Sequence, residues 1–101
     1  MAAKTWTTAD VFAGRGGART DEGGTMSGNL TLRTTWDGAR ADVAVRYTGT
    51  SQWYVLAGSP VPCPDEAESR DLHQAVVDAV RAGDGAEVPR HVRVGPPMRT
   101  R

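Results

Sequence analysis

Hydrophobic and polar residues alternate along two neighbouring stretches, 29–36 and 39–47, with Asp37-Gly38 between them. Alternation with a period of two predicts strands with one buried face, and a two-residue Asp-Gly loop favours a tight type I′ hairpin turn. This turn predicts the register of the hairpin. On the apolar face it pairs Trp36 with Ala39, Thr34 with Ala41, Leu32 with Val43 and Leu30 with Val45. On the other face it pairs Thr35 with Arg40, Arg33 with Asp42 and Thr31 with Ala44. A slip of one residue would expose half of the apolar residues, so the pattern determines which face is buried.

A third strand is predicted over 52–58, after a turn at 48–51 that contains Gly49. This register sets Tyr47 opposite Gln52, Val45 opposite Tyr54 and Val43 opposite Leu56. It also places Trp53 and Val55 on the opposite face of the sheet, beside Arg46 and Ala44. Residues 59–64 contain three prolines and are predicted to be an extended connector, because proline lacks the donor that a central strand needs.

An amphipathic helix is predicted over 65–82. Its apolar stripe has i, i+4, i+7, i+8 spacing and consists of Leu72, Val76, Ala79 and Val80. Asp65 is a good N-cap with Glu68 three residues later, and Gly83 is a good residue to end the helix.

These elements predict an α+β domain in which a three-stranded antiparallel meander (29–36, 39–47 and 52–58) packs on one helix (65–82). A short fourth strand is expected at 91–94, and residues 1–13 could begin with a short helix or a strand. We expect the chain to divide into an N-terminal segment over 1–28 with a flexible glycine-rich loop, a single domain over 29–95 and a disordered basic tail over 96–101.

Composition excludes several classes of protein. The 101 residues suit one domain, and the net charge of +0 provides no overall attraction to nucleic acid or an anionic membrane. A single cysteine excludes an intramolecular disulfide, and no signal region or membrane-spanning stretch is visible. We therefore expect a cytoplasmic protein without a membrane partner. The excess of arginine over lysine, with abundant alanine and glycine, is typical of a GC-rich bacterial genome.

The predicted outer side of the sheet carries the best candidate for a binding patch, namely Trp53, Val55, Ala44 and Arg46. An exposed aromatic residue with a neighbouring arginine is typical of an anchor at a protein interface. The alternative is that Trp6 or Phe12 packs there and forms a second small core.

Cys63 is the one residue that suggests a nucleophile, because it precedes a predicted helix and could pair with His73 or His91. The neighbouring acids Asp65, Glu66 and Glu68 would raise the pKa of its thiol, which opposes that role. Cys63 and the two histidines match no compact zinc pattern.

His73 borders the apolar stripe and is expected to be a half-buried structural residue. We expect no cofactor, no metal and no catalysis, with a thiol enzyme or small-ligand binder as one alternative.

Arginines near the two ends of the chain support a second alternative, which is weak nucleic-acid binding through Arg15, Arg19, Arg90, Arg93, Arg99 and Arg101. A β-β-β-α order after a short N-terminal helix would resemble a double-stranded-RNA-binding domain in shape. That family has a lysine-rich cluster at the start of its last helix, where this chain reads Asp65-Glu66-Ala67-Glu68. We expect a non-catalytic protein-interaction domain, with a protein partner or a second copy docked around Trp53.

Overall fold

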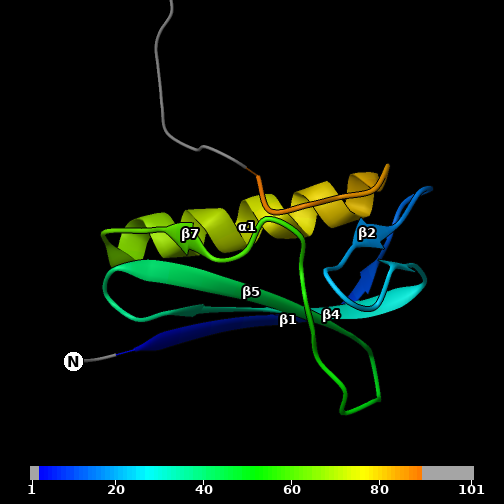
Figure 1. Cartoon of the computed structure of the whole chain (residues 1–101), viewed down its shortest axis with the longest axis horizontal. Coiled ribbons are helices and arrows are strands. Elements are labelled where there is room, and N and C mark those ends of the chain that lie inside the picture. Colours follow the sequence, from blue (N-terminus) through cyan, green and yellow to red (C-terminus); the bar gives the residue numbers. More distant parts are fainter. Residues whose placement is uncertain (1–2, 90–101) are drawn as a thin grey trace, which may run out of the picture.

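An antiparallel sheet and one helix form two layers in the computed structural model, which describes residues 3–89 (Figure 1). The elements are β1 (Lys4–Phe12), β2 (Ala18–Arg19), β3 (Thr25–Met26), β4 (Asn29–Trp36), β5 (Arg40–Tyr47), β6 (Tyr54–Val55), β7 (Val61–Pro62) and α1 (Glu66–Ala82). The main sheet has the order β1-β4-β5-β6 with β7 also paired to β5, and β2 and β3 form a separate hairpin. The α+β class is confirmed, with five strands in the main sheet of the described residues where three were predicted. The strand expected at 91–94 and the tail over 96–101 lie outside the described residues.

The β4–β5 hairpin has the predicted faces but a different register. Leu32 lies opposite Val45 and Trp36 lies opposite Ala41, so each pair is shifted by two residues from the sequence prediction. Because side chains alternate along a strand, a shift of two leaves every residue on the face where it was expected.

The shift arises at the hairpin loop, which is Gly38-Ala39 and not Asp37-Gly38. The Asp37 N–H donates to the Arg40 carbonyl at 3.1 Å, and Gly38 adopts a φ of +102° that favours glycine. The Asp37 carboxylate accepts hydrogen bonds from the N–H groups of Ala39 and Arg40, each at 2.9 Å. An aspartate just before the loop can satisfy these two donors, which explains why the register moves in this direction.

The predicted register between β5 and the third strand is confirmed. Val45 lies opposite Tyr54 and Ala44 lies opposite Val55. Regular pairing is shorter than the predicted span of 52–58 and is limited to Tyr54–Val55.

Residues 4–12 form a strand and not a helix. β1 pairs with β4 from Lys4 opposite Trp36 onward, and a bulge interrupts the pairing between Thr8 and Val11. Asp10 in this bulge has a φ of +57° and accepts a hydrogen bond from the Asn29 amide at 2.9 Å. The N-terminal residues are therefore part of the same sheet as residues 29–55, and the division of the chain at residue 28 does not appear in the fold.

The glycine-rich segment 14–28 is also built into the fold, where the sequence predicted a flexible loop. It contains β2 and β3, whose paired residues Ala18 and Met26 are both buried. The Gly14 N–H donates to the Val80 carbonyl at 2.9 Å, which joins this segment to the last turn of α1. Figure 1 shows the segment at the end of the sheet where α1 finishes. Glycine is needed at Gly14 because a Cβ there would collide with carbonyl groups of α1.

The helix follows the prediction closely. The Asp65 carboxylate accepts a hydrogen bond from the Glu68 N–H at 2.8 Å, and the helix ends before Gly83, which has a φ of +79°. The stripe residues pack on the sheet, and the core between the two layers includes Val11, Met26, Leu30, Leu32, Val43, Val45, Leu56, Leu72, Val76 and Val80.

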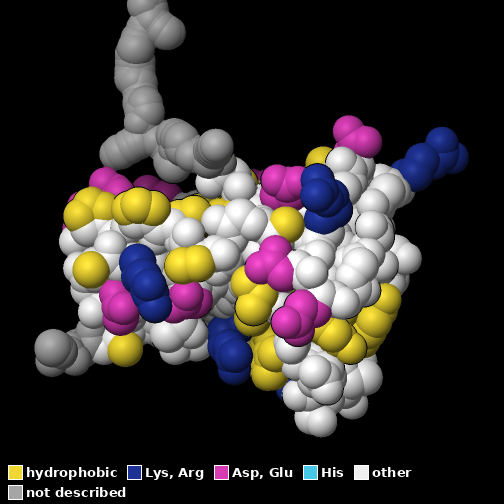
Figure 2. Space-filling view, viewed as in Figure 1, with side chains coloured by type: hydrophobic (Ala, Val, Ile, Leu, Met, Phe, Trp, Pro, Cys, Tyr) yellow, Lys and Arg dark blue, Asp and Glu magenta, His cyan; other side chains and the backbone are white. Residues whose placement is uncertain are grey.

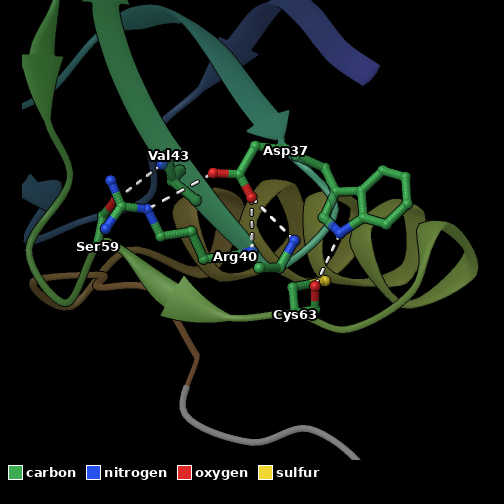
Figure 3. A network of polar contacts seen from close by, with 7 residues as sticks. Asp37, Arg40, Val43, Ser59 and Cys63 are labelled. Carbon is green, nitrogen blue, oxygen red and sulfur yellow. Dashed lines mark hydrogen bonds and ion pairs between the residues drawn. The ribbon is translucent and has the colours of Figure 1, made fainter. Parts of the chain in front are cut away.

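The proline-rich connector 59–64 lies beside the loop end of the hairpin, where the two residues of β7 pair with Arg40 and Ala41 of β5 (Figure 3). The Val43 N–H donates to the Ser59 hydroxyl at 2.8 Å, and the Trp36 indole N–H donates to the Cys63 carbonyl at 2.8 Å. These two bonds join the connector to both strands of the hairpin.

Candidate functional site

The side of the sheet turned away from α1, here called the outer face, carries the predicted patch. No helix or second sheet within residues 3–89 covers it, and Val55 is 46% exposed. Neither aromatic residue that was expected as a cover packs over the patch. The Trp6 indole N–H donates to the Ser69 hydroxyl of α1 at 3.0 Å, so Trp6 belongs to the opposite side. Phe12 lies opposite Asn29 on the outer face but is 64% exposed, so it forms no second core there.

Two arginine side chains contact the Trp53 ring on the outer face. The guanidinium carbon of Arg33 is 4.0 Å from the centroid of the Trp53 ring, and that of Arg46 is 4.7 Å from it. Both distances are within the range of favourable cation–π contacts.

The two arginines have no acidic partner among the described residues. Ion pairs there involve other cations, namely Lys4, Arg19, Arg40 and Arg70. Asp42 lies opposite Thr35 and pairs with neither arginine. The Arg46 Nε is buried without a hydrogen-bond partner. The site therefore contains two half-buried positive charges that share one aromatic ring.

Arg33 is the residue that sequence reasoning missed. In the predicted register it lies opposite Asp42, which would neutralise it. In the observed register it lies opposite Ala44 and extends to Trp53. The signal that could have found it is the Asp37 carboxylate, which sets the loop at Gly38-Ala39. The structure thus adds Arg33 to the predicted set of Trp53, Val55, Ala44 and Arg46.

Cys63 is buried and has the environment of an unreactive thiol. Its Sγ–H donates to the Asp65 carbonyl at 3.6 Å. Burial raises the pKa of the Cys63 thiol, and the negative charges of Glu68 and Asp65 raise it further. A raised pKa disfavours the thiolate that a nucleophile requires. His91, one of its two suggested partners, lies outside the described residues.

His73 lies between α1 and the sheet, where two threonine hydroxyls hold its ring. Its Nε2 is 2.8 Å from the Thr8 Oγ1, and its Nδ1 is 2.9 Å from the Thr34 Oγ1. Burial lowers the pKa of the imidazole, which favours the neutral form. With both ring nitrogens engaged by threonines, His73 joins α1 to β1 and β4.

The arginines of the nucleic-acid alternative are not brought together by the described part of the chain. Arg19 forms an ion pair with Glu87, and Arg15 is exposed in the preceding turn. The remaining four, Arg90, Arg93, Arg99 and Arg101, lie outside residues 3–89. In Figure 2 hydrophobic side chains lie in small groups among charged ones, and no broad basic area appears on the side shown.

A shallow hollow of about 420 Å³ lies beside the connector and is lined by Ala39, Arg40, Pro60, Val61 and Pro62. Arg40 is its one charged residue and is paired with Asp37, so the hollow offers little chemistry (Figure 3). Residues 3–89 contain no group of three or more histidine, cysteine or acidic side chains that could hold a metal ion. Nor do they contain a helix of the length and apolarity needed to cross a membrane.

Comparisons with known proteins assign no relative to this chain. No protein-family model, no curated protein and no solved structure matches it.

Proposed function

We propose that this protein is a small non-catalytic interaction domain that binds another protein on its outer face. The observation that supports this function is the half-buried Trp53 on the outer face, in contact with Arg33 and Arg46, which have no acidic partner in the described residues. Tryptophan and arginine are the residues most enriched among energetically dominant interface positions. Val55 extends the patch with an exposed apolar side chain.

A different protein fits this surface better than a second copy of the chain. Two copies docked through the same patch would bring four guanidinium groups together, and like charges across an interface are unfavourable. Self-association is therefore an outcome that the experiment must detect.

The test is site-specific photo-crosslinking in the native host, with the photoreactive p-benzoylphenylalanine in place of Val55. The matched control carries the same group in place of Gln74, an exposed residue of α1 on the other side of the molecule. We expect a protein adduct of defined mass from position 55 and none from position 74. The purified partner should bind the unmodified chain and lose at least about tenfold in affinity on Trp53→Ala.

Three results would overturn the proposal. They are an adduct with nucleic acid, equal adducts from both positions, and a purified partner that binds Trp53→Ala as well as the unmodified chain. An adduct between two copies of the chain would replace the proposed partner with a homodimer.

A further inference from the structure

We propose that the outer face binds an extended acidic segment of its partner, whose carboxylates on alternate residues contact Arg33 and Arg46. This inference rests on the proposed function and specifies the chemistry of the partner. It follows from three features of the patch, which are its charge, the separation of its two arginines and the apolar surface beside them.

The positive charge of the patch favours binding of an anionic group. Arg33 and Arg46 repel each other across one ring, and no acid of residues 3–89 pairs with either of them. Residues 90–101 contain four arginines and neither aspartate nor glutamate. A carboxylate can accept two hydrogen bonds from one guanidinium, so an acidic side chain of the partner complements this charge.

The separation of the two guanidinium groups suits an extended peptide. Both lie over the same ring at 4.0 and 4.7 Å from its centroid, so they cannot be farther apart than the sum of these distances. In an extended chain, side chains at i and i+2 lie on one side and are about 6.6–6.8 Å apart. This spacing lies within the upper limit, so two acidic residues separated by one residue can reach both arginines.

The apolar part of the patch favours a peptide over a nucleic acid. Two guanidinium groups already contact the Trp53 ring, which leaves less of it for a stacked base. Val55 is 46% exposed beside Ala44 and offers an aliphatic surface to an apolar side chain of the bound segment. An acidic segment with an aliphatic residue at its edge complements both parts of the patch.

The experiment uses the full chain and a fluorescent peptide in which glutamate alternates with threonine and one end carries leucine. The matched peptide has glutamine in place of glutamate. We expect the glutamate peptide to bind at low salt, and the glutamine peptide to bind at least about tenfold more weakly. Affinity should fall as the salt concentration rises from about 50 to about 300 mM, because the contacts are ionic.

Two charge-neutralising variants locate the peptide on the protein. Arg33→Gln and Arg46→Gln should each weaken binding about tenfold. Arg70→Gln removes the same charge from the exposed side of α1 and should leave affinity within about twofold. Circular dichroism checks that each variant is folded.

The acidic-segment proposal is overturned by equal binding of the two peptides, by equal effects of Arg33→Gln and Arg70→Gln, or by tighter Arg33-dependent binding of a single-stranded oligonucleotide. A crosslinked partner from position 55 that binds Arg33→Gln and Arg46→Gln normally would overturn it while the proposed function stands. Absence of both the adduct and peptide binding would overturn both proposals.

Discussion

At the scale of single residues, His73 links stability to pH. Its folded-state pKa is lowered by burial from the ordinary value of 6.5. As pH falls through 6.5, the unfolded chain takes up a proton that the folded chain resists, so the unfolded state binds more protons. We predict that the free energy of unfolding decreases as pH falls from about 7.5 to about 5.5, measured by urea denaturation at each pH.

His73→Gln separates this effect from other titrations, because glutamine does not ionise and can still hydrogen-bond to a threonine hydroxyl. The variant should be less stable than the unmodified chain at pH 7.5 and should show a flatter pH dependence above about pH 5.5. Identical slopes for the two proteins over this range would contradict the assignment to His73.

At the scale of elements, the β2–β3 hairpin offers a matched pair of glycines. Gly17 and Gly24 have nearly the same φ, +67° and +70°. A Cβ on Gly17 would collide with the Met26 carbonyl, whereas a Cβ on Gly24 would meet nothing within 4 Å. We predict that Gly24→Ala costs about 1 kcal/mol in the free energy of unfolding, and that Gly17→Ala costs about 1–3 kcal/mol more.

Denaturant titration of both variants measures this difference. Because the two backbones have similar φ, the difference between the variants reports the collision and not the left-handed conformation. Equal losses would mean that the segment is not packed as described.

The strand faces were predictable because they depend on a period of two that any even register preserves. The register itself was not predictable from the alternation, since Asp37-Gly38 and Gly38-Ala39 both give the same faces. The choice depends on hydrogen bonds from two N–H groups to the Asp37 carboxylate. For the same reason Trp53, Val55, Ala44 and Arg46 were placed correctly on the outer face, while Arg33 was paired with the wrong neighbour.

At the scale of the whole molecule, long-range contacts decide what local patterns leave open. Residues 4–12 suit a strand or a helix, and pairing with β4 selects the strand. The glycines of residues 14–28 suggest a flexible loop when they are considered alone, because glycine loses the most entropy on ordering. Gly14 lies so close to the carbonyl groups at the end of α1 that a Cβ would not fit there. This contact explains why the position needs glycine, and it cannot be predicted from the neighbouring residues in the sequence.

Met26 tests whether this N-terminal region is part of one cooperative unit. Its side chain is 1% exposed and packs in the core between sheet and helix. Met26→Ala should therefore cost about 2–5 kcal/mol in the free energy of unfolding, whereas Ser27→Ala, at an exposed neighbouring position, should change it by less than about 0.5 kcal/mol. A loop outside the core would show no such difference.

The cooperative behaviour of Met26→Ala is as informative as the size of its effect. Tryptophan fluorescence reports on the sheet side of the molecule through Trp6, Trp36 and Trp53, and far-ultraviolet circular dichroism reports mainly on α1. If residues 3–89 unfold as one unit, both signals should shift to the same lower urea midpoint in this variant. Separate midpoints would mean that the sheet unfolds apart from the helix and that residues 3–89 are not one cooperative unit.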